Sequence, residues 1–158
     1  MKNASLLICF LAGCIGQPGS ADEDALGDID HEPTGDEHRP GQPCLVCHGA
    51  EYTPGHEVFE VAGTIYETID AQTGTADVEV IIEDADGREI RLRSNRVGNF
   101  YLEEDAPIRY PLQVAIERDG ERVEMRSPIV REGSCAHCHT KEGPNESSVG
   151  RVFLRETP

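Results

Sequence analysis

Basic residues are scarce in this chain, and its N-terminal apolar run is too short to cross a membrane. Only 14 Lys and Arg stand against 30 Asp and Glu, which gives a formal net charge of −16 over 158 residues. A chain of this charge repels nucleic acid and anionic lipid headgroups, so nucleic-acid binding is excluded. The apolar run from Ala4 to Ala12 is far shorter than the roughly 20 residues that a membrane-spanning helix requires.

Helical periodicity and catalytic groupings are also missing. Short apolar runs alternate with period two, and no comparable stretch shows the helical period. The sequence holds no Ser-His-Asp grouping and no phosphate-binding loop, and no acid–base pair lies near the cysteine motifs described next. We therefore do not expect the protein to be an enzyme.

Cysteine occurs only near the N-terminus and in two short motifs. Besides Cys9 and Cys14, every cysteine falls in CLVCHG at 44–49 or in CAHCHT at 135–140. Both segments contain the pattern C-x-x-C-H, which is a haem attachment signature. Its two thiols can reach the two vinyl groups of one porphyrin, and the histidine that follows comes beneath the iron.

The two signatures resemble those of c-type cytochromes. The resemblance covers only the motif residues, and it implies two covalently attached haem c groups. The proximal iron ligands are then His48 and His139, and the four thioether residues are Cys44, Cys47, Cys135 and Cys138. Every cysteine after Cys14 is thereby assigned, as expected for an exported chain in an oxidising compartment.

Two other uses of the cysteine pairs stay open. Four cysteines can hold a structural zinc ion, although zinc-binding pairs usually lie closer together in sequence. Zinc also gives no reason for a histidine directly after both pairs. The pairs could instead form disulfides, although closing so short a loop gains little stability.

The N-terminus has the pattern of a secretory signal peptide. MKNASLLICFLAGCIG has a positive start, an apolar stretch and small residues. Leu11-Ala12-Gly13-Cys14 resembles the lipobox of bacterial lipoproteins, which implies a signal peptide over 1–13 and lipid attached to Cys14. Ile15 after the cysteine points to anchoring in the outer membrane, on its periplasmic or extracellular face. The alternative is an ordinary signal peptide with a leftover thiol.

Residues 14–43 follow as an acidic tether. They are rich in Asp, Glu and Pro, and they contain no aromatic residue. Such a segment buries too little apolar surface to offset the entropy of ordering, so we expect it to be disordered and solvated.

The middle of the chain, from 58 to 130, has the alternation of short β-strands. Turn dipeptides at Asp86-Gly87 and Asp119-Gly120 separate successive runs. We expect six strands, near 58–67, 77–84, 88–95, 98–104, 111–118 and 121–128.

The sequences VAGTIY, VEVIIEDADGREI and SNRVGNFYL resemble carboxypeptidase regulatory-like domains. The resemblance implies a mainly β fold, a small Greek-key sandwich of the transthyretin-like or immunoglobulin-like kind. Haem-binding segments at 44–57 and 131–158 flank it. Because an even number of antiparallel strands returns the chain to the end where it began, we expect the two signatures to lie together.

The second axial ligand decides what each haem does, because two strong ligands favour electron transfer and an open position favours binding of small molecules. The main candidates are His56, Met125 and His137. His31 and His38 lie in the acidic tether, where a solvated role is the simpler expectation. Met125 falls on the apolar face of the last expected strand, where core packing is the alternative.

These observations lead us to expect a membrane-tethered dihaem cytochrome that relays electrons. Its partners are redox proteins, other cytochromes first among them, and self-assembly into a filament stays open. One alternative is a haem-based sensor or binding module with an open iron position for a gas or peroxide. Another is a structural surface lipoprotein stabilised by metal.

Overall fold

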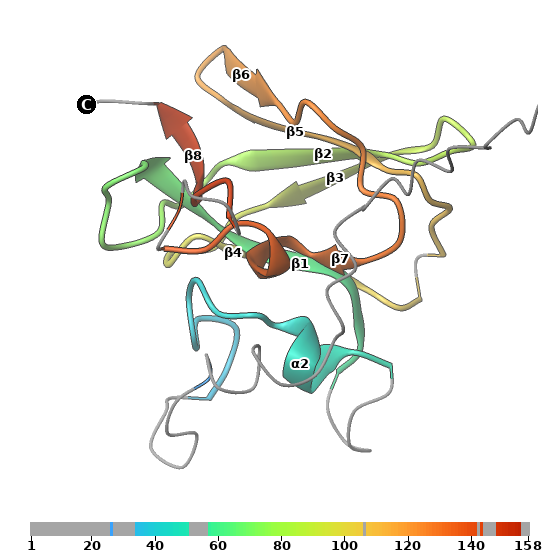
Figure 1. The fold of residues 1–158 in the computed structure, drawn as a ribbon, viewed down its shortest axis with the longest axis horizontal. Coiled ribbons are helices and arrows are strands. Elements are labelled where there is room, and N and C mark those ends of the chain that lie inside the picture. Colours follow the sequence, from blue (N-terminus) through green and yellow to red (C-terminus); the bar gives the residue numbers. More distant parts are fainter. Residues whose placement is uncertain are drawn as a thin grey trace, which may run out of the picture.

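The computed structural model describes residues 26, 34–50, 57–105, 107–141, 143 and 148–155. Within these ranges the chain is mainly β, with two sheets and two single-turn helices (Figure 1). The elements are α2 (Leu45–His48), β1 (Phe59–Thr68), β2 (Glu79–Glu83), β3 (Glu89–Arg93), β4 (Asn99–Glu103), β5 (Gln113–Arg118), β6 (Glu121–Glu124), β7 (Gly133–Ser134), η1 (Cys135–His137) and β8 (Val152–Arg155).

Two four-stranded sheets make up the sandwich. One has the order β4-β1-β7, with β8 also paired to β1, and the other has the order β3-β2-β5-β6. The six expected strands are confirmed as β1 to β6. The two-residue loop between β5 and β6 has positive φ at both Asp119 (53°) and Gly120 (83°), as a tight hairpin turn requires. The mainly β sandwich expected from the sequence is therefore confirmed.

The hydrophobic core lies between the two sheets. Both sheets contribute alternate residues to it, and its largest fully buried side chains are Val61, Ile65, Val78, Val80, Ile82 and Leu112. Removing such side chains from water stabilises the fold by roughly 25 cal/mol per Å² of apolar surface. This core holds β1 as a rigid strand in the middle of its sheet.

A register shift between Phe59 and Val61 gives the start of β1 an unusual orientation. Val61 packs into the core, but Phe59 stacks on Tyr101, at 4.4 Å between ring centroids, on the outer face of the sheet. Such a bulge re-aims the side chains of one strand segment. The outer face of β1 and β4 thereby gains an aromatic platform beside the first cysteine signature.

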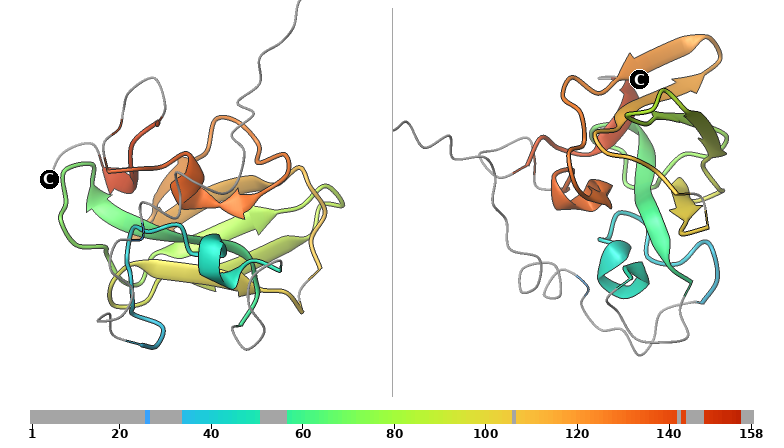
Figure 2. Two further views of the ribbon diagram at one scale, coloured as in Figure 1. Left: turned by 60° about the horizontal axis from the view of Figure 1, so that its bottom comes forward. Right: turned by 90° about the vertical axis from the view of Figure 1, so that its right-hand side faces the viewer.

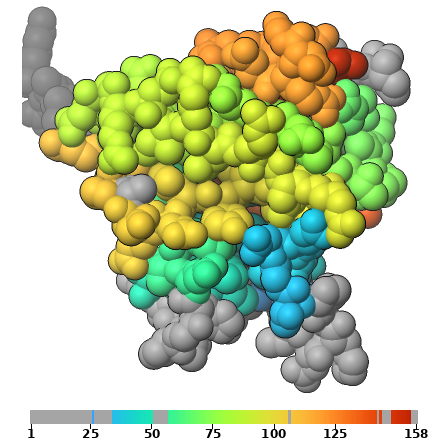
Figure 3. All heavy atoms as spheres, turned by 180° about the vertical axis from the view of Figure 1, so that it is seen from behind, coloured from blue at the N-terminus to red at the C-terminus, as the bar shows by residue number. Residues whose placement is uncertain are grey.

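Residues 34–43 pack against this outer face, although their composition assigns them to the disordered tether. The side chain of Asn99 donates hydrogen bonds to the carbonyls of Asp36 (3.3 Å) and His38 (2.9 Å). The N–H of Gly41 donates to Oγ1 of Thr64 at 2.7 Å. Figure 3 shows this segment, in blue, seated against the yellow region around β4. Residues 34–43 therefore pack against the sheet ahead of Cys44, because backbone groups supply the contacts that apolar side chains lack.

The two signatures lie side by side next to β1 (Figure 2). The strand β7, which leads into the second signature, runs parallel to β1 and pairs Gly133 with Val61. The chain reverses direction an even number of times between β1 and β7, so the two strands run the same way. This agrees with the expectation from six antiparallel strands. The meeting point is along the first half of β1, because β7 pairs with Val61 and Ala62.

Candidate functional site

Both C-x-x-C-H segments fold into the same backbone turn. In each, the N–H groups of the second cysteine and of the histidine donate to the carbonyl of the first cysteine. The N···O distances are 3.2 and 2.9 Å in Cys44–His48 and again 3.2 and 2.9 Å in Cys135–His139. The two segments share this geometry although their spacer residues differ. Such a turn places both thiols and the imidazole of each signature on a few residues of chain.

Each signature histidine is held in the same way. Nδ1 of His48 lies 2.7 Å from the carbonyl oxygen of Glu57, and Nδ1 of His139 lies 2.8 Å from that of Gly150. A carbonyl can only accept, so Nδ1 carries the proton and the lone pair is on Nε2. This is the arrangement by which proteins orient a histidine that binds a metal. Sequence reasoning missed both partners, because a backbone carbonyl has no residue-type signal.

The first cysteine of each signature is partly buried. Cys135 contacts the core cluster beside Gly63, where an added Cβ would lie 2.7 Å from Cβ of Cys135. Burial raises the pKa of Cys135 to about 12 and that of Cys44 to about 11. The electrostatic influence of Cys44 adds to the rise of the pKa at Cys135. Cys138, by contrast, is exposed.

Aromatic rings surround the first signature. His48 stacks on Phe59 with 4.4 Å between ring centroids and 11° between ring planes, and Phe59 stacks in turn on Tyr101. His38 approaches from the covering segment 34–43, with its ring centroid 5.7 Å from that of His48. These contacts restrain the orientation of the His48 ring.

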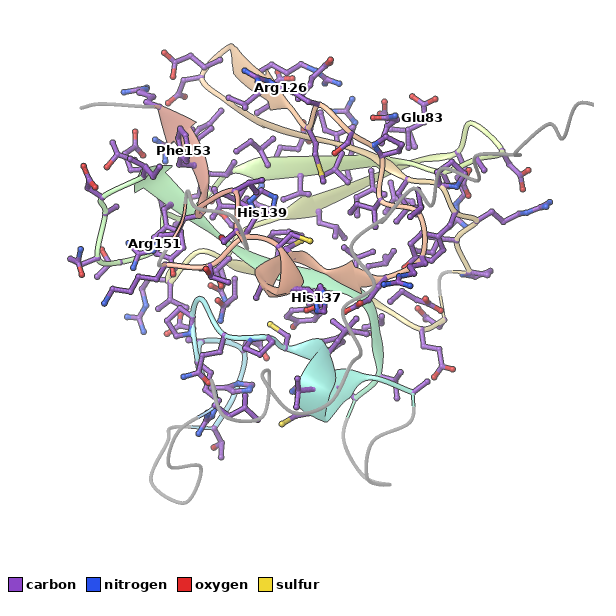
Figure 4. All side chains as sticks on the ribbon, viewed as in Figure 1. Glu83, Arg126, His137, His139, Arg151 and Phe153 are labelled. Atoms are coloured by element: carbon purple, nitrogen blue, oxygen red, sulfur yellow. The ribbon has the colours of Figure 1, made fainter. Side chains whose placement is uncertain are left out.

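A small hollow of about 20 Å³ lies beside the second signature, and it can hold one water molecule. Its lining includes Thr64, Tyr66, His139 and Arg151. The guanidinium of Arg151 sits 4.4 Å from the Tyr66 ring centroid, and its buried Nε has no hydrogen-bond partner. Figure 4 shows His139 and Arg151 beside β1.

Burial lowers the pKa of His139, and the hydrogen bond to Gly150 offsets part of this shift. The imidazole of His139 therefore stays neutral, with its lone pair available, below the pH at which an ordinary histidine becomes protonated.

The candidate distal ligands have different placements. Met125 follows β6 in the opposite sheet, where its N–H donates to the carbonyl of Val114. Nδ1 of His137 lies 3.9 Å from the carboxylate of Glu132. His56, like His31 and the proposed lipid-bearing Cys14, lies outside the described residues. His38, for which a solvated role in the tether is the simpler expectation, has its ring centroid 5.7 Å from that of the signature histidine His48.

The zinc and disulfide alternatives gain no support from the geometry. Cys44, Cys47, Cys135 and Cys138 are all free thiols. Within the described ranges, no three His, Cys, Asp or Glu side chains converge as ligands of one metal ion. No helix in those ranges is long and apolar enough to span a membrane.

No family model, curated protein or solved structure matches the chain, so its function has to be inferred from the residues themselves.

Proposed function

We propose that this chain is a dihaem c-type cytochrome, a lipoprotein that carries electrons at the cell envelope. The supporting observation is that two C-x-x-C-H segments far apart in sequence share one backbone turn and one histidine hydrogen bond. A four-cysteine zinc site or a pair of disulfides needs neither feature. Haem attachment uses both, together with every cysteine of the folded part.

Each residue of a signature has a defined role in this proposal. The two cysteines form thioethers with one porphyrin, and the histidine binds its iron through Nε2. The carbonyls of Glu57 and Gly150 hold His48 and His139 in the tautomer that ligation requires. A bound haem supplies reversible one-electron oxidation and reduction.

A haem attached at the second signature would lie on the surface of the sheet. The hollow holds only a water-sized volume, about 20 Å³, so a porphyrin has to lie outside it. The thiol of Cys135 then turns away from the core to reach the ring. The buried Nε of Arg151, which has no partner, provides a hydrogen-bond donor for an anionic group such as a haem carboxylate.

The position of the two signatures supports electron relay. Both contact β1, and Cys44 is close enough to Cys135 to influence its pKa. Two haems attached there are held close together by one rigid strand. The net charge of −16 favours partner proteins with a basic docking face, and we propose other cytochromes as these partners. Anchoring through lipid on Cys14 places the relay at the envelope, in the outer membrane.

Haem content is the direct test. The full-length protein should be made in cells that have a haem-attachment system, and haem counted by pyridine haemochrome absorbance and by intact mass. We expect two haems in the wild type. Replacing both cysteines of either signature with alanine should leave one haem, and Cys14→Ser is the matched control that keeps two.

A wild-type chain without covalent haem under these conditions would falsify the cytochrome proposal. Carbon monoxide binding to the reduced protein then separates electron carriage from ligand sensing. Rapid binding at both irons would favour a sensor, because an electron carrier keeps two strong axial ligands on its iron.

A further inference from the structure

His38 belongs to the segment 34–43, which is bound to the sheet by a series of buried hydrogen bonds. The N–H of Gly41 donates to Oγ1 of Thr64, which donates to Oδ1 of Asn99 at 2.8 Å. The amide nitrogen of Asn99 then donates to the carbonyl of His38 at 2.9 Å. Thr64 and Asn99 are only 6% and 8% exposed, so water competes little for these bonds. The backbone of His38 is thereby fixed relative to β1.

The His38 side chain is oriented as well. Its Nδ1 hydrogen-bonds to the carbonyl of Gly35, within the same turn. This contact puts the proton on Nδ1 and the lone pair on Nε2, as in both signature histidines. The ring of His38 is half-buried and lies near the ring of His48, whose own orientation is set by Glu57 and by stacking on Phe59.

The spacing of these two rings suits a shared iron. A metal-bound imidazole nitrogen lies about 2 Å from the metal and about 1 Å from its own ring centre, so two axial imidazoles have centres about 6 Å apart. The centroids of His38 and His48 are 5.7 Å apart. Their planes cross at 44°, which two axial ligands can adopt because each ring can turn about its own iron–nitrogen bond.

We propose that His38 is the second axial ligand of the haem attached at Cys44 and Cys47, opposite His48. This inference rests on the proposed function. It assigns the first haem to electron transfer, because two imidazoles leave the iron no open position. It also gives residues 34–43 a purpose, since the Thr64 and Asn99 contacts hold the ligand in place before a haem is attached.

The experiment uses the full-length, haem-loaded protein. His38→Ala should keep two haems but convert one iron from low spin to high spin in electron paramagnetic resonance. The reduced variant should bind one more carbon monoxide per chain than the wild type, and added imidazole should reverse both changes. His38→Met, a second variant, should restore a low-spin iron with a raised midpoint potential. Glu37→Gln, in the same segment but paired with Arg96, is the matched control and should leave the first haem unchanged.

The proposal is overturned if His38→Ala retains both haems and shows the spin state and carbon monoxide stoichiometry of the wild type. Failure of the cytochrome proposal is seen separately, because it appears as missing haem in the wild type before any histidine is replaced.

Discussion

Cys135 should be the least reactive thiol of the haem-free chain. Its pKa is raised from 9.0 to about 12 because the side chain is packed against the core beside Gly63. Near pH 8 this lowers its thiolate fraction about a thousandfold, since each pKa unit is a factor of ten. The more basic thiolate is intrinsically more nucleophilic, and this raises the alkylation rate by about 20- to 30-fold. The net expectation is alkylation about 30 to 60 times slower than for an ordinary thiol.

The same reasoning orders the other thiols. The pKa of Cys44 is raised to about 11, so its net slowing is about tenfold, whereas Cys138 is exposed. Haem-free protein, made without a haem-attachment system and kept reduced, should be treated with iodoacetamide at pH 8. Peptide mass spectrometry at successive times should then show Cys138 modified first, Cys44 next and Cys135 last.

Denatured protein provides the control, because all three thiols should react at similar rates once the core is lost. If Cys135 reacts as fast as Cys138 in the native, haem-free chain, the packing of Cys135 beside Gly63 is wrong. In the haem-loaded protein none of the three should react, because their sulfurs are thioethers.

Four further outcomes are expected. Gly63→Ala should destabilise the haem-free chain by about 1–3 kcal/mol in chemical denaturation, because the new Cβ overlaps Cys135. The free energy of unfolding of the haem-free wild-type chain should fall by about 1.4 kcal/mol per pH unit as pH rises from 9.0 towards about 12. The reason is that the thiol of residue 135 loses its proton in the unfolded chain over this range but keeps it in the folded chain. Chemical denaturation at two alkaline pH values measures this fall. Arg151→Gln should lower the midpoint potential of the second haem in a redox titration without loss of haem, because it removes a cation that disfavours the oxidised form. Cys14→Ser should move the protein from the membrane to the soluble fraction; continued retention would contradict the lipid anchor.

Strand alternation and turn residues were sufficient to predict β1 to β6. Period-two apolar runs bounded by Asp-Gly turns have a direct physical meaning where one face of a strand packs into the core, as in β2. In β6 all four residues are exposed, so its alternation reflects pairing with β5 and not core packing. The strand β7 could not be predicted, since Gly133 and Ser134 offer no alternation and their pairing with Val61 and Ala62 depends on where the chain returns. Such short strands exist only through tertiary contact.

The thiols and histidines of the candidate site can be identified from the sequence, but their surroundings cannot. Thiol and imidazole spacing is visible in a sequence, whereas the carbonyls of Glu57 and Gly150 are not. Residues 34–43 show the same limit. Their acidic composition predicts disorder, but Thr64 and Asn99 bind the backbone of this segment, and composition does not reveal backbone hydrogen bonds.

One strand sets the relation between the two signatures. The first meets β1 at Phe59, which stacks on His48, and the second meets it at Gly63, which contacts Cys135. Four residues of extended strand cover about 13 Å. The separation of the attachment points is therefore fixed by the local geometry of β1. Lengthening a loop elsewhere in the sandwich should leave electronic coupling between the haems intact, whereas removing the bulge between Phe59 and Val61 should change it by turning Phe59 away from His48.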